Sequence, residues 1–361
     1  MTFEAVVARS WSANRLVSVL LELTYRCNLD CFFCYNDLNL RGSALTFEHY
    51  ERMLRDLAAM NVLTVVLSGG EPLAHPDFFR IGALARELGF VVRVKSNGHA
   101  LRGELARRLR DEVDPFVVEV SLHGATAETH DRQTRVTGSF ERLLANIGEL
   151  LALGVRVKVN STLTRWNEQE VEGMYAITDS LSVPLRFDLQ VSPRDDGDRA
   201  PLAVAPTPEG ITHLLQVDTA RYEAATEAAS EAASGGAPRP PGSGGPAIDD
   251  EIVPAVAGKH CGAGSSGIAI DPYGNIYPCV QWRRSVANLH DVSIAELWGD
   301  EQAFEAIRDA TTGAAGVVAA HPRGKLLNFC PGLAEMLTGS PTTVPVEMER
   351  QAEIIARSGG K

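Results

Sequence analysis

The chain has 361 residues, of which 45% are hydrophobic and 22% charged, and its formal net charge is −12. This length suits two domains, or one barrel with an appendage, and no apolar run approaches the roughly 18–20 residues of a membrane-spanning helix. The acidic balance argues against nucleic acid as a general partner, because phosphate binding needs a basic surface. It favours a basic or neutral substrate only weakly, since such charge commonly serves solubility.

The lack of a secretory signal and the grouping of the cysteines both indicate the cellular compartment. The first residues lack the basic region and apolar stretch of a secretory signal. The six cysteines form two sets of three and do not resemble a disulfide framework. We therefore expect a cytoplasmic protein that uses its cysteines for metal binding in a reducing environment.

The first apolar run, residues 16–23, is followed directly by Cys27, Cys31 and Cys34 at C-x3-C-x2-C spacing. Three close thiolates can hold three irons of a [4Fe–4S] cluster and leave the fourth iron open. Structural zinc and buried apolar thiols are the alternatives. Zinc usually needs four ligands in spaced pairs, and no fourth Cys or His lies nearby in the sequence.

This triad resembles the cluster-binding motif of the radical S-adenosylmethionine (SAM) superfamily. The resemblance implies that the open iron chelates SAM, and that an electron from the cluster cleaves SAM to methionine and a 5′-deoxyadenosyl radical, which abstracts a substrate hydrogen. Phe33, between the second and third cysteines, stands where the family has an aromatic residue beside the adenine. A core aromatic is the equal alternative for Phe33.

Short runs rich in Val and Leu alternate with helical patterns up to residue 190. Strands are expected near 17–23, 62–67, 91–95, 116–122, 155–162 and 185–191, and helices near 47–60, 76–88, 102–110, 139–153 and 168–180. Such repeats imply a parallel sheet covered by helices, and near-continuous apolar strands are typical of burial on both faces. The predicted fold class is α/β, a partial (β/α)6 TIM-like barrel, which the resemblance also implies.

A turn with two glycines, Ser68-Gly69-Gly70-Glu71-Pro72, follows the second predicted strand. Glycines at a strand end let the backbone approach a ligand closely, and parallel α/β folds place their sites at strand carboxyl ends. By resemblance, Gly69, Gly70 and Glu71 bind the amino group of SAM. Taken alone, such a turn can equally serve only to connect a strand to a helix.

Polar residues also end the next strands. By resemblance, Ser96 and Asn97 lie near the SAM ribose, and Ser121 bonds the ribose or the carboxylate. Arg135 matches an arginine that pairs with the SAM carboxylate, a task suited to its planar guanidinium. A solvated arginine at a helix start is the alternative.

The remaining candidates near strand ends have less specific roles. His123 stands where many relatives carry Asp, and we expect a hydrogen-bonded structural histidine rather than a proton-transfer group. Asn160 is expected to line the SAM and substrate cavity, together with Thr162, Gln190 and Ser192.

The composition changes after residue 222. Residues 223–234 are rich in Ala, Glu and Ser and predict a frayed helix, and residues 235–246 predict a flexible linker with too few apolar residues to pack. The predicted division is a barrel over 1–222, a linker over 223–251 and an auxiliary domain over 252–361, which ends in a helix near 346–357.

The second cysteine set comprises Cys261, Cys279 and Cys330. An Asp-Pro-Tyr-Gly-Asn segment between apolar stretches predicts a β-hairpin that brings Cys261 near Cys279. This region resembles the SPASM/twitch extension, the auxiliary iron–sulfur domain of radical SAM enzymes that modify peptides. Full SPASM domains have more cysteines and two clusters. We expect one auxiliary [4Fe–4S] cluster in this small domain, with one position open or filled by a group such as His260. Buried thiols and three-thiolate zinc are the alternatives.

The leading functional hypothesis is a radical SAM oxidoreductase that installs a C–C or thioether crosslink in a ribosomally synthesised peptide. If all six cysteines are ligands, none remains as a hydrogen-atom donor, which disfavours epimerisation. The alternatives are radical oxidation or rearrangement of a small metabolite in an antibiotic or cofactor pathway, and a non-catalytic iron–sulfur scaffold or electron carrier. The glycine turn and Arg135 argue against a carrier, which has no need of SAM.

The hypothesis also implies partners. A precursor peptide is the expected substrate, and flavodoxin or ferredoxin the expected electron donor. Because the barrel begins almost at Met1, we expect a separate protein or the barrel rim to recognise a peptide leader. Neither nucleic acid nor a membrane is an expected partner.

Overall fold

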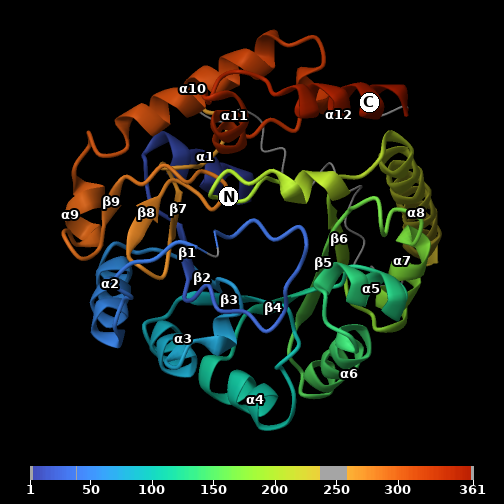
Figure 1. Ribbon diagram of the computed structural model, residues 1–361, viewed down its shortest axis with the longest axis horizontal. Coiled ribbons are helices and arrows are strands. Elements are labelled where there is room, and N and C mark those ends of the chain that lie inside the picture. The colour runs from blue at the N-terminus through green and yellow to red at the C-terminus, as the bar shows by residue number, and fades with distance from the viewer. Residues whose placement is uncertain (1–2, 38, 236–257, 359–361) are drawn as a thin grey trace.

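The protein is represented by a computed structural model that describes residues 3–37, 39–235 and 258–358. Its centre is a nine-stranded sheet in the order β6-β5-β4-β3-β2-β1-β7-β8-β9. Neighbouring strands from β6 through β7 are parallel, and β8 and β9 are antiparallel additions. Figure 1 shows helices α2 to α7 around the outside of this curved sheet.

The strands and helices have the following bounds. The strands are β1 (Ser18–Glu22), β2 (Thr64–Ser68), β3 (Val91–Ser96), β4 (Val117–Ser121), β5 (Val157–Thr162), β6 (Leu185–Asp188), β7 (Gly267–Ile270), β8 (Asn275–Tyr277) and β9 (Ala287–Asn288). The helices are α1 (Phe3–Ser12), α2 (Phe47–Ala59), α3 (Phe78–Glu87), α4 (Gly103–Arg108), α5 (Ala127–Thr134), α6 (Ser139–Ala152), α7 (Val171–Ser180), α8 (Pro208–Gly235), α9 (Ile294–Gly299), α10 (Glu305–Ala320), α11 (Pro331–Thr338) and α12 (Val346–Arg357).

The two faces of the sheet differ because side chains alternate along each strand. On β3, Val92 and Val94 are buried in the apolar layer beneath the helices, whereas Arg93 and Lys95 lie on the opposite, inner face. The same alternation places Glu119 of β4 on the inner face. The predicted barrel is confirmed. The expectation of strands buried on both faces holds for β2, in which residues 65–68 are all buried, but not for β3, where Arg93 and the exposed Lys95 lie on the inner face.

The auxiliary region continues the barrel sheet. Strand β7 pairs in parallel with β1, so residues near 267 lie beside residues near 18. The predicted hairpin is confirmed: β7 and β8 are antiparallel, and Asp271 Oδ1 accepts the backbone N–H groups of Tyr273 and Asn275 at 2.8 and 2.9 Å. Gly274, at φ +84°, supplies the left-handed residue that this turn needs.

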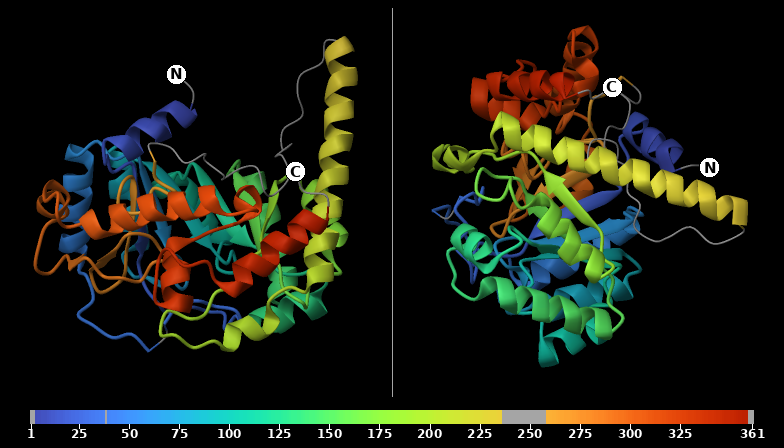
Figure 2. Two further views of the ribbon diagram at one scale, coloured as in Figure 1. Left: turned by 90° about the horizontal axis from the view of Figure 1, so that it is seen from above. Right: turned by 90° about the vertical axis from the view of Figure 1, so that its right-hand side faces the viewer.

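Helix α8 bears on the predicted domain boundaries. It runs unbroken over Pro208–Gly235, so residue 222 falls inside a helix, and Figure 2 shows α8 as one long helix extending past the sheet. The rest of the predicted linker lies outside the described residues. Helix α12 packs against α8, where Ser358 Oγ donates to Thr212 Oγ1 at 3.1 Å. Across the described ranges, no helix has the length and apolarity needed to cross a bilayer.

Candidate functional site

The first three cysteines lie in the loop that follows β1. All three are free thiols; Cys27 is exposed, and Cys31 and Cys34 are half-buried. The backbone N–H of Cys34 donates to the carbonyl of Cys31 at 3.1 Å, which turns the loop tightly. Burial raises the pKa of the Cys31 thiol well above its ordinary value, and the neighbouring Cys34 and Cys27 raise it further. Three thiolates this close therefore need a cationic centre to hold them together.

Helix α5 fastens this loop from one side. The N–H groups of Asp30 and Phe32 donate to the carbonyls of Thr134 and Gln133 at 3.1 and 3.0 Å. Arg135, in the left-handed conformation after α5, lies 3.2 Å from the Asp30 carboxylate and stacks over the Phe32 ring at 4.9 Å. In this structure Arg135 thus contacts the carboxylate of Asp30, which belongs to the cysteine loop.

The glycine turn fastens the loop from the other side. The N–H of Gly70 donates to the carbonyl of Thr24 at 2.6 Å, and that of Glu71 to the carbonyl of Arg26 at 2.9 Å. A Cβ on Gly69 would lie 2.4 Å from the Thr24 oxygen, and one on Gly70 would lie 2.6 Å from the Arg26 oxygen. The predicted close backbone approach is present, but its nearest partner is the chain just before Cys27.

Replacing Gly69 by alanine is expected to displace the cysteine loop. The residue has a φ of +135° and no room for a Cβ, so strain and overpacking together should cost at least about 2 kcal/mol and lower iron incorporation. Gly89→Ala is the matched control, because Gly89 has a φ of +86° but nothing within 4 Å. Iron content and urea unfolding check both variants; equal effects would contradict the crowding argument.

Glu71 links the ends of β2 and β3. Its buried carboxylate accepts hydrogen bonds from Ser96 Oγ at 2.9 Å, from the Asn97 N–H at 2.9 Å and from the Leu73 N–H at 3.2 Å. Burial raises the pKa of Glu71 to about 7. Asn97 Nδ2 in turn lies 3.5 Å from Cys27 Sγ, so Glu71 positions the first cysteine through one intervening residue.

Buried polar atoms without partners surround the loop. Phe33 contacts the His123 ring edge-on at 4.7 Å, and His123 Nδ1 is buried with no hydrogen-bond partner. Asn36 Oδ1 and His99 Nε2 share this state. The expectation of a hydrogen-bonded histidine ring is therefore wrong at His123 Nδ1. Buried polar atoms normally have partners, so this group is suited to a polar ligand beside the cysteines.

A buried neutral histidine makes the fold sensitive to acid. Burial lowers the pKa of His130 to about 4, and its Nδ1 accepts the His123 N–H at 3.0 Å. A pKa below the unfolded value gives stability that is complete above pH 6.5 and is lost as pH falls toward 4. From pH 7 to pH 5, His130 should contribute about 2 kcal/mol to the loss of stability measured by urea unfolding, and His130→Gln should remove that share. The exposed His290→Gln should leave the loss intact, and an undiminished loss in His130→Gln would contradict this account.

The later strand ends reach across the inner face. Ser121 and Asn160 are register partners on β4 and β5, and Asn160 Nδ2 donates to Glu119 Oε2 at 2.9 Å. After β6, Ser192 Oγ donates to Gln281 Oε1 at 3.1 Å. Ser192 therefore joins the barrel to the auxiliary region.

The second cysteine set also converges. Burial raises the pKa of Cys330 to about 12 and that of Cys261 to about 11, and the nearby Cys279 raises both further. His260 Nε2 lies 2.7 Å from the Phe329 carbonyl, which assigns that nitrogen as the donor and leaves Nδ1 with the lone pair. The predicted alternative ligand is thus oriented by the residue that precedes Cys330.

A buried ion cluster connects the two regions, and the sequence analysis missed it. Arg283 donates to both oxygens of Glu22 at 2.8 Å, and its Nε lies 2.9 Å from Asp195 Oδ2. The side chains of Arg283 and Glu22 are 9% and 0% exposed. Glu22 ends β1, five residues before Cys27. A charged residue closing an otherwise apolar strand was the available signal.

The donor set suits clusters. Within the described ranges, no three His, Cys, Asp or Glu side chains converge as they would around one metal ion. In a four-iron cluster each thiolate binds a different iron. Within each triad, repulsion between the thiolates raises the pKa values of the thiols. Each triad is therefore suited to binding a cationic iron–sulfur cluster.

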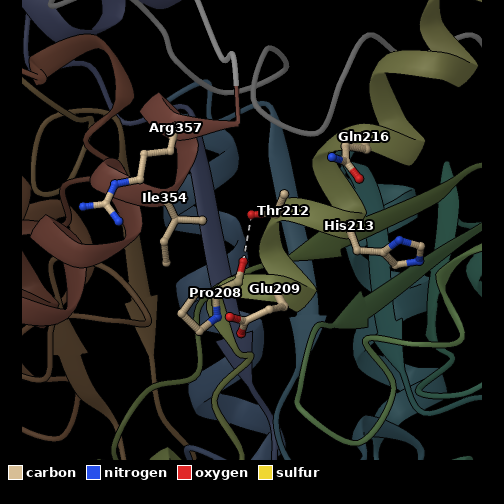
Figure 3. Close-up of a pocket in the computed structure, with 7 residues that line it drawn as sticks. All are labelled: Pro208, Glu209, Thr212, His213, Gln216, Ile354 and Arg357. Atoms are coloured by element: carbon tan, nitrogen blue, oxygen red, sulfur yellow. Dashed lines mark hydrogen bonds between the residues drawn. The ribbon is translucent and has the colours of Figure 1, made fainter.

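A pocket of about 290 Å³ lies elsewhere, between α8 and α12 (Figure 3). It is lined by Pro208, Glu209, Thr212, His213, Gln216, Ile354 and Arg357. None of these is a candidate site residue, so the pocket is separate from the cysteine site.

A curved parallel sheet with a three-cysteine loop after its first strand defines the class of partial-barrel iron–sulfur proteins. The family model of the radical SAM superfamily matches residues 21–176, and that of SPASM, an iron–sulfur cluster-binding domain, matches residues 261–321. The chain belongs to the radical SAM superfamily and carries a SPASM domain. The predicted cofactor classes, iron–sulfur clusters and SAM, are thereby confirmed.

Similar proteins include peptide maturases and haem synthases. Mycofactocin maturase MftC of Mycobacterium ulcerans is 30% identical over 303 residues, covering 82% of this chain and 78% of its own. PqqA peptide cyclase of Ruegeria pomeroyi is 28% identical, covering 81% and 76%. AdoMet-dependent heme synthase of Methanosarcina barkeri is 27% identical, covering 82% and 86%. The chain is thus a radical SAM enzyme related to peptide maturases.

Two solved structures share the fold. SuiB of Streptococcus suis bound to S-adenosylmethionine superposes with a TM-score of 0.70 at 14% identity, over 93% of this chain and 77% of that one. The anSMEcpe protein with bound AdoMet and the Cp18Cys peptide gives 0.68 at 16% identity, over 96% and 100%. These matches confirm the predicted fold class.

Proposed function

We propose that this enzyme oxidises a ribosomally synthesised peptide, forming a C–C or thioether crosslink. The observation that carries the proposal is the connection of two cysteine triads through one continuous sheet, in which β7 of the auxiliary region pairs with β1 of the barrel. The Arg283–Glu22 ion pair reinforces that junction. An oxidation that removes two hydrogens needs one group to generate the substrate radical and another to accept the remaining electron. Two cluster sites joined by one continuous sheet could supply these two groups.

Cys27, Cys31 and Cys34 would hold the SAM-binding cluster, with Glu71 and Asn97 fixing the position of Cys27. When bound, that cluster supplies the electron for reductive cleavage of SAM, which generates the hydrogen-abstracting radical. The polar and glycine residues near the adjoining strand ends are Ser96, Ser121, Asn160, Gly69 and Gly70, and Phe33 lies within the cysteine loop. Arg135 would exchange Asp30 for the SAM carboxylate.

The auxiliary cluster would be held by Cys261, Cys279 and Cys330. His260 Nδ1 is the available fourth donor, since Nε2 is committed to the Phe329 carbonyl. We propose a single cluster in this domain because it has three thiols.

The peptide class follows from the relatives. Mycofactocin maturase and PqqA peptide cyclase are named for peptide maturation, and SuiB has been solved with its precursor peptide SuiA. A tetrapyrrole is the second candidate substrate, because the heme synthase of Methanosarcina barkeri aligns over 86% of its own length. A flavodoxin or ferredoxin would donate the electron.

Co-expression tests the peptide proposal. A short open reading frame beside the gene would be expressed with the enzyme, and the peptide analysed by mass spectrometry. We expect the loss of two hydrogens in an enzyme-dependent crosslink. An unchanged peptide, together with conversion of a tetrapyrrole carboxylate, would favour the second candidate.

A further inference from the structure

Four basic side chains lie on the inner face of the barrel sheet. Alternation along β3, β5 and β6 puts them opposite the helix-facing residues. They are Arg93, Lys95, Lys158 and Arg186. The same face of β3 to β6 carries two carboxylates, Glu119 and Asp188. The inner face of β3 to β6 is therefore basic, although the chain as a whole has a net charge of −12.

The register brings these charges together. Lys95 pairs with Glu119 across β3 and β4, and Glu119 pairs with Lys158 across β4 and β5. Glu119 is buried and already bonded to Arg93 and to Asn160. Burial is the largest single influence on the pKa of Glu119 and raises it, but Lys95, Arg93, Asn160 and Lys158 together lower it. One carboxylate thus lies among three cations, Arg93, Lys95 and Lys158.

Solvent reaches this face. Lys95 is exposed although β3 is a central strand, and Lys158 and Arg186 are half-buried. A face filled by packed side chains would bury such a lysine. The basic side chains are therefore accessible to a bound molecule.

The basic face adjoins the first cysteine triad. Lys95 precedes Asn97 by two residues, and Asn97 contacts Cys27. Lys158 lies two residues, about 7 Å, before Asn160 and four residues before Thr162, at which β5 ends. This places it below the strand-end residues that are candidates for SAM.

We infer that the inner face binds the carboxylates of an anionic substrate, with Lys95 and Lys158 as its main cationic contacts. The inference rests on the proposed function, because it assigns the substrate class of the same site. Side chains of Asp or Glu in a peptide and propionates of a tetrapyrrole share this chemistry. It reverses the weak sequence-based preference for a basic or neutral substrate, since the local charge opposes the charge of the whole chain.

Paired probes test the inference. Anaerobic titration of the reconstituted enzyme with SAM would compare a Glu-Gly repeat peptide with its Gln-Gly counterpart, and coproporphyrin III with its tetra-amide. We expect the acidic member of at least one pair to bind about tenfold more tightly. The double variant Lys95→Gln/Lys158→Gln should lose this preference. The matched control, Arg107→Gln/Lys325→Gln, removes two exposed bases elsewhere and should keep it.

Each outcome decides the matter. A preference confined to the peptide pair identifies a peptide carboxylate, and one confined to the porphyrin pair identifies propionates. Equal binding within both pairs, or a preference that survives in the double variant, overturns the inference. Binding is measured without turnover. The wild-type enzyme could bind the acidic probes more tightly and yet form no 5′-deoxyadenosine. That result would refute the proposed function and leave this inference standing.

Discussion

Replacing Cys31 by alanine is expected to abolish 5′-deoxyadenosine formation and to remove about four of about eight irons per chain. Cys31 is the central thiol of the first triad, and its pKa is raised by burial and by both neighbouring thiols, so this loop is suited to a cationic cluster. Two cysteines cannot hold a four-iron cluster with three ligated irons. Iron and sulfide analysis and chromatography of the SAM products measure the two effects.

Cys279→Ala is the informative counterpart. It should also lower iron by about four per chain, yet retain part of the SAM cleavage, because the first triad is intact. If both variants lost SAM cleavage completely while only one lost iron, the assignment of separate clusters to the two triads would be wrong. Full iron content in Cys279→Ala would refute an auxiliary cluster.

Replacing Arg283 by methionine should destabilise the protein by about 3–5 kcal/mol. The change leaves Glu22 and Asp195 buried together without their cation. Burial raises the pKa of Asp195 to about 7 even with Arg283 present. A carboxyl pKa above its unfolded value means that stability falls as pH rises, so the deficit should be larger at pH 8 than at pH 5. Urea unfolding at both pH values measures it.

The control for Arg283 is an exposed ion pair. Arg221 and Asp179 lie 2.8 Å apart but are 42% and 51% exposed, so Arg221→Met should cost no more than about 1 kcal/mol. Adding Glu22→Gln and Asp195→Asn to Arg283→Met should recover part of the loss. A loss for Arg283→Met no larger than that for Arg221→Met would show that the buried cluster does not stabilise the junction.

The strands and most barrel helices could be predicted because their signals are local. Helix α2, for example, buries Tyr50, Met53, Leu54 and Leu57 on one face, a spacing that the sequence displays directly. The glycine turn was also predictable as a close approach, because glycines at a strand end let the backbone come near a neighbouring group. Its partner was not, since the backbone of residues 24–26 competes with a ligand for the same space.

The remaining features depend on distant pairs. Arg283 and Glu22 are 261 positions apart, and the pairing of β7 with β1 is equally non-local. No periodicity within either segment specifies such a contact.

The basic inner face was missed for a related reason. The charged residues of β3 can be recognised as part of a basic face only when the register of β4 and β5 is known, because that register aligns Lys95, Glu119 and Lys158 in one row.

The most direct test of the central claim is SAM cleavage by the anaerobically reconstituted protein. With dithionite as reductant, the wild-type chain should convert SAM to 5′-deoxyadenosine and methionine, and Cys31→Ala should not. Reducible clusters without 5′-deoxyadenosine, with or without peptide and tetrapyrrole candidates, would contradict the account and leave an iron–sulfur protein that performs no radical chemistry.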